Sequence, residues 1–392
     1  MRVRKTVGVV AALVLAGCGS TSQGAEGSTP PGMQSSASPP GAAPAGGPVP
    51  RGFVAADFTS VSPDLGWVLG TASCAAAACT SIVRSTDGGK TWVGLPAPKA
   101  ELEDAGPTAC EGKACVRGIR FATADIGYVY GSTGLYLTKD GGATWTKAAG
   151  QADAIEAGNG TVVRVSHDTQ GCPPGCTFQI STAPVGSTDW RPAQVPAAPM
   201  LGTYVQLVRT GKLAFVQIHA NPAGGAEDAH TGLLASTDNG RSWTAHDDPC
   251  GTHGGVEADG AQLATGDDGS LSLLCVPRGG GTDFVITSLD GGAHFGAQRG
   301  VTTGALGDGL ASASGSTLVV TAVTGTTFTL YRSVDAGSTW QQVATAPAPG
   351  QDSAASAPIG FQNATVGRFA THTHALLSTT DGGASWATYT FR

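Results

Sequence analysis

The sequence predicts an all-β protein, a seven-bladed β-propeller of four-stranded antiparallel blades over residues 51–392. Three observations predict it. A box of the form Ser/Thr-x-Asp-x-Gly-x-x-Trp occurs seven times, and its successive Asp residues stand 45 to 53 residues apart. Runs of strand length, rich in Val, Thr and Ser, lie between the boxes. A period of about 40–50 residues with several short strands per unit is typical of propellers.

Residues 1–17 are expected to be a signal peptide. Arg2, Arg4 and Lys5 precede the apolar run VGVVAALVLAG at 7–17, which is too short to span a bilayer as a permanent helix. The run ends in Leu-Ala-Gly before Cys18 and so resembles the bacterial lipoprotein signal. That resemblance implies cleavage before Cys18, a diacylglyceryl group on its thiol and usually an acyl chain such as palmitate on its amine. Several lipid chains anchor a protein stably. An ordinary secretory signal with a chance Cys is the alternative.

Residues 18–50 are expected to form a lipidated Cys followed by a disordered tether. Ser, Gly, Pro and Ala dominate positions 19–50, and such a segment buries too little apolar surface to fold. A flexible coil of this length reaches about 30–35 Å on average. The folded part is therefore expected near the cell membrane on its extracytoplasmic side.

The charge balance excludes some classes of partner. Loss of residues 1–17 removes three cationic side chains and moves the formal net charge from −7 to −10. The chain has no basic patch, which argues against nucleic acid and against an anionic membrane surface as partners. We expect a monomer that requires no cofactor.

The cysteines are consistent with an exported protein. Eight remain besides Cys18, and eight allow 105 connectivities. Proximity in the sequence favours four pairs: Cys74 with Cys79, Cys110 with Cys115, Cys172 with Cys176, and Cys250 with Cys275. Zinc ligation is the alternative, but the close pairs lie in different repeats and share no set of partners.

Each residue type in the box has a physical role in forming a tight turn. Asp and Ser/Thr side chains bind nearby backbone N–H groups, Gly supplies positive φ, and Trp buries a large ring. The box therefore predicts a clip between the third and fourth strands of a blade. The Asp and aromatic positions, all predicted to be structural, are Asp87 and Trp92, Asp140 and Trp145, Asp189 and Trp190, Asp238 and Trp243, Asp290 and Phe295, Asp335 and Trp340, and Asp381 and Trp386.

Strands are expected around each box. The ranges predicted for blade 1 are 53–60, 66–73, 80–85 and 91–95, those for blade 2 are 116–123, 126–131, 134–138 and 144–148, and the last strand of blade 7 is 385–392. The seven units run in phase from first to fourth strand. Closure of the ring is then expected from residues 47–52 or from packing of blade 1 on blade 7.

The box resembles the Asp-box, or bacterial neuraminidase repeat, and blade 2 is also similar to the propeller family of the photosystem II stability and assembly factor. The resemblance covers residues 51–392 and implies the fold, but it does not imply that this chain takes part in photosystem assembly. Two boxes depart from the pattern. The third contains an insertion, and the fifth has Phe295 in place of Trp.

Catalysis is not favoured by the residues. A sialidase would need an Arg triad and a Tyr–Glu pair, yet the chain reads Arg51-Gly52-Phe53 where the family has Arg-Ile-Pro, and its tyrosines have no obvious Glu partner. Asp-box xyloglucanases use a cleft between two propellers, and this chain has one. A glycan-binding protein or a glycoside hydrolase of Asp-box type remains the alternative to a binding protein.

The topology places the boxes on one face of the ring, the box face. The loops between second and third strands and the links between blades lie on the opposite face, the loop face, together with the eight cysteines and most histidines. The candidate binding residues there are His219, Asp228, His230, His246, Asp247, Asp248 and His253, and the weak candidate metal ligands among them are His219, His230, His246 and His253. Solvated polar loops are the alternative. We expect a membrane-anchored scaffold or assembly factor that binds a protein or cell-envelope partner through the loop face.

Overall fold

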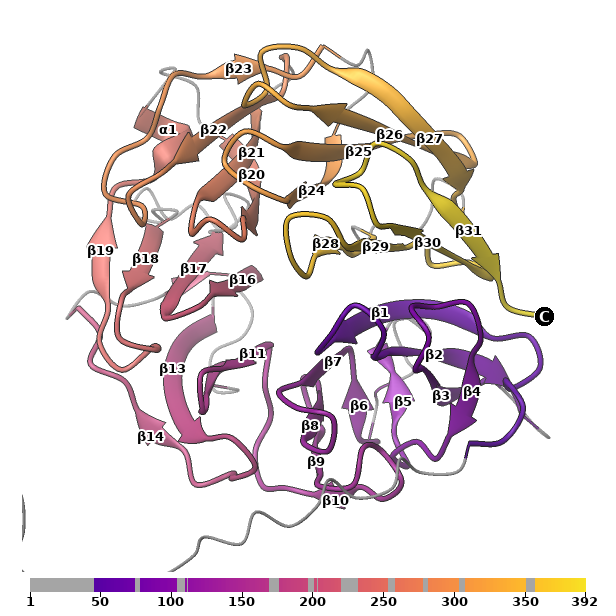
Figure 1. Ribbon diagram of the computed structural model, residues 1–392. Coiled ribbons are helices and arrows are strands. Elements are labelled where there is room, and N and C mark those ends of the chain that lie inside the picture. Colours follow the sequence, from indigo (N-terminus) through magenta and orange to yellow (C-terminus); the bar gives the residue numbers. More distant parts are fainter. Residues whose placement is uncertain are drawn as a thin grey trace, which may run out of the picture. The chain divides into compact units, whose positions relative to one another are not determined.

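The structure is a computed structural model that describes residues 46–74, 78–103, 110, 112–168, 176–196, 201–202, 204–219, 232–252, 258–277, 281–302, 307–349 and 357–392. Cys18 and the predicted signal and tether therefore lie outside the described residues. The described chain from residue 46 forms seven antiparallel sheets arranged in a ring (Figure 1). This confirms the predicted fold class. Within the described residues no helix has the length and apolar character needed to cross a membrane.

Each blade is one continuous stretch of chain whose strands follow in order from the inner to the outer edge. Blades 1 to 3 contain β1 (Val54–Ser60), β2 (Gly66–Ser73), β3 (Ala78–Ser85) and β4 (Val93–Leu95), then β7 (Gly118–Phe121), β8 (Gly127–Tyr130), β9 (Leu135–Thr138) and β10 (Thr146–Lys147), then β11 (Ala154–Gly158), β12 (Thr161–His167), β13 (Cys176–Pro184) and β14 (Arg191–Pro192).

The remaining blades repeat the same order. Blades 4 to 7 contain β16 (Tyr204–Thr210), β17 (Leu213–His219), β18 (Gly232–Ser236) and β19 (Thr244–His246), then β20 (Ala258–Thr265), β21 (Leu271–Pro277), β22 (Phe284–Ser288) and β23 (Arg299–Gly300), then β24 (Gly307–Ser312), β25 (Leu318–Thr324), β26 (Thr327–Ser333) and β27 (Gln341–Pro347), then β28 (Ile359–Phe361), β29 (Gly367–Ala370), β30 (Ala375–Thr379) and β31 (Ala387–Thr390). Short additions are β5 (Glu101–Leu102) paired with β6 (Cys115–Val116), β15 (Leu201–Gly202) paired with β13, and the single turn α1 (Pro249–Thr252).

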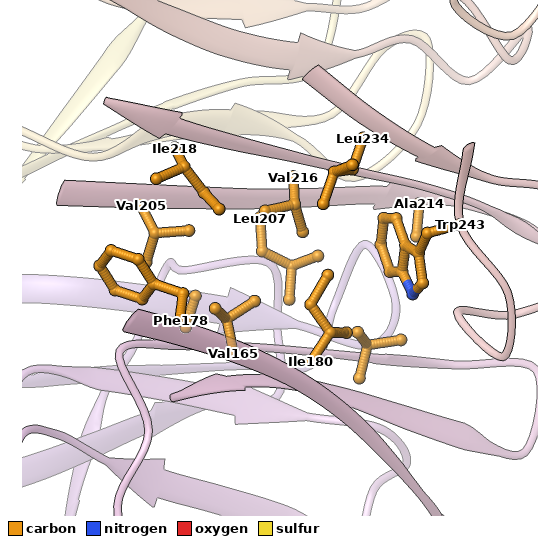
Figure 2. Packing of buried hydrophobic residues seen from close by; sticks show 12 residues of the cluster. Val165, Phe178, Ile180, Val205, Leu207, Ala214, Val216, Ile218, Leu234 and Trp243 are labelled. Carbon is orange, nitrogen blue, oxygen red and sulfur yellow. The ribbon is translucent and has the colours of Figure 1, made fainter. Parts of the chain in front are cut away.

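The core lies between neighbouring blades. Figure 2 shows one such interface, where Val165, Phe178 and Ile180 of blade 3 meet apolar side chains of blade 4. Alternation along each strand sends these residues to one surface of the sheet. Full burial of each large aliphatic or aromatic side chain stabilises the fold by about 1.5–3 kcal/mol.

The repeated box forms a hydrogen-bonded clip. In blade 1, Ser85 Oγ donates to Asp87 Oδ1 at 2.8 Å and accepts from Gly89 N at 2.8 Å, while Thr91 N donates to Asp87 Oδ1 at 2.9 Å. Gly89 has φ of 90°, which a residue with Cβ adopts only under strain. The same Ser/Thr, Asp and Gly bonds recur in the boxes of Asp140, Asp238, Asp290, Asp335 and Asp381.

Of the two unusual boxes, the fifth keeps the clip and the third does not. In the fifth, His294 N donates to Asp290 Oδ1 at 2.9 Å, and Phe295 replaces only the buried ring. In the third, Trp190 follows Asp189 directly, so Asp189 does not form the clip, and β13 is joined to β14 through a turn in which Ser187 N donates to Pro184 O at 3.0 Å. Instead Asp189 N donates to Ser187 Oγ at 3.0 Å, and the Arg164 guanidinium lies 4.4 Å from the Trp190 ring.

Blade 1 packs directly on blade 7 and closes the ring. Ala55 N donates to Thr373 O at 3.0 Å, and the Phe53 ring lies 4.8 Å from that of Phe391. Gly47 also exchanges two 2.9 Å hydrogen bonds with Gly94, at the outer edge of blade 1. Of the two predicted routes to closure, the packing of blade 1 on blade 7 is therefore present, whereas the Gly47–Gly94 pair lies within blade 1. In the described part of the chain, no blade combines strands from the first and last blades.

Candidate functional site

Disulfides brace the loop face. Cys74 is joined to Cys79, Cys110 to Cys115 and Cys250 to Cys275, with Cα–Cα distances of 5.9, 5.6 and 5.6 Å. These are the pairs expected from proximity. Of the fourth predicted pair, Cys172 lies outside the described residues, and Cys176 begins β13 with a side chain that the structure does not describe.

The described parts of the link between blades 1 and 2, residues 96–103, 110 and 112–117, are held by several contacts. β5 pairs in parallel with β6, so Glu101 lies beside Cys115. Glu103 accepts hydrogen bonds from Arg117 Nε and from Ser132 N, and Cys115 N donates to Thr133 Oγ1 at 2.8 Å. Burial alone would lower the pKa of Arg117, but the charge of Glu103 raises it. The described ends of the link are therefore tied to the neighbouring β8–β9 loop.

A central channel runs between the inner strands. Its box-face end is a cavity of about 270 Å³ lined by residues of all seven blades, and its loop-face end is a cavity of about 260 Å³ lined by blades 2 to 7. The two cavities share Arg120, Glu156 and Leu207 among their lining residues, so they are the overlapping ends of one passage.

Arg120 joins three blades at the middle of this channel. It donates from Nη1 to Asp57 Oδ2 in β1 and from Nε to Glu156 Oε1 in β11, each at 2.8 Å. Asp57 Oδ2 also accepts from Ile119 N at 2.9 Å. Burial alone would lower the pKa of Arg120, but the charges of Asp57 and Glu156 raise it well above its ordinary value.

Asp57 and Glu156 are the carboxylates that a hydrolase in the channel would use. In glycoside hydrolysis two carboxyl groups flank the scissile bond, and the space between them holds the substrate. Here the guanidinium of Arg120 occupies the space between the two groups and binds both. The arrangement therefore suits a structural tie better than acid–base chemistry.

The loop-face mouth carries a second group of charges. His167 Nδ1 lies 2.8 Å from Asp153 Oδ2, and Gln151 Nε2 donates to His167 O at 3.1 Å. Asp153 and Arg117 both line the loop-face cavity. Burial raises the pKa of Tyr130, which lines the same end. This mouth therefore combines an anion, a cation and a phenol on rigid elements, and such a surface can orient a polar partner.

The binding residues predicted in blades 4 and 5 are only partly described. His246 ends β19, Asp247 follows it, and Asp248 Oδ1 accepts from Cys250 N at 3.0 Å at the start of α1. His219 ends β17 with a side chain that is not described, and Asp228, His230 and His253 lie outside the described residues. Among the described side chains no group of three metal-binding residues occurs. The metal hypothesis for these positions stays a prediction.

The sequence reading did not single out the channel residues Asp57, Arg120 and Glu156. A signal was present, since each is a charge within a short apolar inner strand, in VAADF, GIRF and AIEA. A charge at such a position implies a buried counter-charge. Nothing in the sequence indicates that the three charges belong to one another, because they lie in three different blades.

Comparisons with known proteins show the fold alone. No family model matches the chain, and no curated protein matches it. Among solved structures, YCF48 bound to D1 peptide has a TM-score of 0.51 at 14% identity, with 89% of this chain and 94% of that chain covered. An ulvan lyase of polysaccharide lyase family PL25 has a TM-score of 0.52 at 9% identity, with 87% of this chain and 97% of that chain covered.

Proposed function

We propose that this protein is a binding propeller, anchored by lipid on Cys18 to the extracytoplasmic side of the cell membrane, that holds a protein partner through its loop face. The observation that carries the proposal is the loop-face channel mouth, where Arg117, Asp153 and His167 are fixed on braced elements. The Leu-Ala-Gly-Cys run supports the anchor. The repeated boxes resemble the Asp-box and lie on the face opposite these loops.

Rigidity at this mouth favours binding. Ordering a flexible loop on association costs free energy, and a loop that is already ordered avoids that cost. The Cys110–Cys115 disulfide and the Glu103–Arg117 ion pair hold the described ends of the blade 1–2 link, and the Asp153–His167 contact holds the start of blade 3. Lys99 and Lys113 are exposed on the same link, and Lys113 pairs with Glu101 at 3.3 Å, so reversal of the two lysine charges would alter this surface.

The structural comparisons give limited support. YCF48 has the same fold and is named as bound to a D1 peptide, so a propeller of this shape can hold a peptide. At 14% identity this similarity does not indicate that the present chain binds the same peptide, and we propose only that its partner is a protein.

A glycan-binding or glycan-cleaving protein is the second candidate. The observation that favours it is the pair Asp57 and Glu156, two carboxylates that face one channel. The position of Arg120 between them counts against cleavage. The ulvan lyase shares the fold and acts on a polysaccharide, and nothing more is carried over from it.

The test is affinity capture from cross-linked native membranes. A loop-face variant, Lys99→Glu with Lys113→Glu, is compared with a matched box-face variant, Lys90→Glu with Lys139→Glu, and all four lysines are exposed. We expect one protein partner that is recovered with the wild type and the box-face variant and is depleted with the loop-face variant. Equal recovery with both variants would contradict the loop face as the binding surface. Recovery of cell-wall glycan without any protein would favour the second candidate.

A further inference from the structure

Two asparagines of the described chain are followed by glycine, and both lie in tight turns. Asn159 and Gly160 form the two-residue turn between β11 and β12, with φ of 46° and 72°. Asn239 and Gly240 lie in the turn of the fourth box, with φ of 66° and 82°. Asn and Gly adopt positive φ more readily than other residues. The two pairs therefore share their sequence and the hand of their backbone, so any difference in their reactivity must come from their surroundings.

The first turn leaves its asparagine open to reaction. Asn159 and Gly160 are exposed, and within the described residues neither the Asn159 side chain nor Gly160 N has a hydrogen-bond partner. Apart from its chain neighbours, no described atom lies within 4 Å of the position that a Cβ would occupy on Gly160. An amide nitrogen that follows asparagine can attack the side-chain carbonyl carbon, and glycine hinders this approach least because it has no Cβ. Gly160 N can therefore reach Asn159 Cγ when this exposed turn moves.

The second turn is held closed by its neighbours. Asn239 Oδ1 accepts from Arg209 Nη2 at 2.8 Å, and Gly240 N donates to Ser236 Oγ at 2.9 Å. Gly240 is buried, and a Cβ in its place would lie 2.5 Å from a methyl carbon of Val163. The nitrogen that would attack is therefore already bonded, and the carbonyl group that it would attack is fixed by a cation.

We infer that Asn159 is a site of spontaneous deamidation in the folded protein and that Asn239 is protected from the same reaction. Gly160 N loses its proton to a base in the solvent and forms a bond to Asn159 Cγ, and the side-chain amide leaves as ammonia. The product is a cyclic succinimide. Water then adds to a carbonyl carbon of the ring and breaks its bond to the nitrogen, which gives aspartate when the carbon is Cγ and isoaspartate when it is the main-chain carbon. The net change is an amide and water to a carboxylic acid and ammonia, with no oxidation or reduction.

The modification would alter the surface beside the fourth box. Arg209, which holds Asn239, also donates from Nη1 to Thr161 O at 2.9 Å, so the β11–β12 turn lies next to that box. Either product adds a carboxylate to this turn. Isoaspartate also lengthens the main chain by one methylene group, which disturbs the pairing of Gly158 with Thr161 across the turn. The site does not depend on the proposed binding of a protein at the loop face.

The test is peptide mass spectrometry of the full-length protein after incubation at mildly alkaline pH, with and without denaturing urea. Trypsin releases the two asparagines in separate peptides, residues 148–164 and 213–241. Exchange of the amide for a carboxyl group raises the mass of a peptide, and its fragments show which residue has changed. Two hydrogen bonds must break before Asn239 reacts, so in the folded protein we expect its modification to be at least about thirtyfold slower than that of Asn159. In urea, where neither turn persists, we expect similar rates.

Two variants separate the chemistry from the surroundings. Asn159→Gly keeps a residue that adopts positive φ and removes the amide, so its peptide 148–164 is expected to keep its mass. Arg209→Met, with folding checked by its melting temperature, frees Asn239 Oδ1 and is expected to speed modification of Asn239 by about tenfold.

Three results would overturn the inference. The first is absence of product at Asn159 in the folded protein under conditions in which the unfolded protein reacts. The second is an equal rate at Asn159 and Asn239 in the folded protein, which would mean that the hydrogen bonds of the fourth box give no protection. The third is an unchanged rate at Asn239 in Arg209→Met. None of these results bears on the capture of a protein partner at the loop face.

Discussion

Replacement of Arg120 by methionine tests whether the channel charges hold the ring together. The guanidinium binds Asp57 and Glu156 at 2.8 Å each, and the side chains of the three residues are 25%, 10% and 22% exposed. Removal of one partner from a buried ion pair costs about 3–5 kcal/mol, because the remaining charge is left without compensation. Since each group keeps some access to water, we expect the lower end, a loss of about 3 kcal/mol in the free energy of unfolding.

Urea unfolding of the wild type and Arg120→Met measures this loss. Arg241→Met is the matched control, because Arg241 is exposed in the fourth box and its replacement is expected to change stability by no more than about 0.5 kcal/mol. A triple variant with Arg120→Met, Asp57→Asn and Glu156→Gln is expected to regain most of the loss, since neither carboxylate is then left without its cation. A loss below about 1 kcal/mol for Arg120→Met would refute the reasoning, because surface ion pairs are worth that little.

Three further predictions follow from the clips, the bridges and the anchor. The side-chain hydrogen bond from Thr91 lowers the pKa of Asp87 to about 2, so the stability that this carboxylate contributes is present above pH ~4 and is lost as pH falls towards 2. Asp87→Asn should therefore show a smaller drop in melting temperature than the wild type between pH ~4 and 2, as measured by calorimetry. An identical drop in the two proteins would contradict the assignment. Removal of the Cys250–Cys275 bridge, which closes a loop over a separation of 25 residues, should lower the free energy of unfolding by about 3.5 kcal/mol. Removal of Cys74–Cys79, with a separation of 5, should lower it by about 2 kcal/mol. Urea midpoints of the two double Cys→Ser variants in the reverse order would argue against loop closure as the cause. Cys18→Ser should move the protein from the membrane fraction to the soluble fraction, and retention in membranes would argue against lipid anchoring.

The fold was predictable because its determinants are local. The range 66–73 predicted for a strand coincides with β2, Gly66–Ser73, and the box of Asp87 and Trp92 forms the expected turn. Alternation and turn residues act over fewer than ten positions, so a single sequence records them. The third box supports this conclusion, because its departure from the pattern is visible in the sequence and Asp189 does not form the clip in the structure.

The channel was not predictable for the opposite reason. Arg120 binds one carboxylate 63 residues before it and another 36 residues after it, and the pairing depends on how neighbouring blades are rotated about the ring. Sequence patterns identify charges within apolar strands, but only the closed ring shows which of them meet.

The ring closes without a shared blade, and this has a consequence for how such a chain can change over evolutionary time. Every sheet of the described chain is encoded by one uninterrupted segment, and the first and last blades meet through side chains and backbone hydrogen bonds such as that from Ala55 N to Thr373 O. Duplication or deletion of one segment would therefore add or remove a whole blade and leave every other sheet intact. A ring whose last sheet borrows a strand from the start of the chain lacks this freedom, because its ends must stay matched. The boxes are spaced 45 to 53 residues apart, so such a step would copy or remove a similar number of codons.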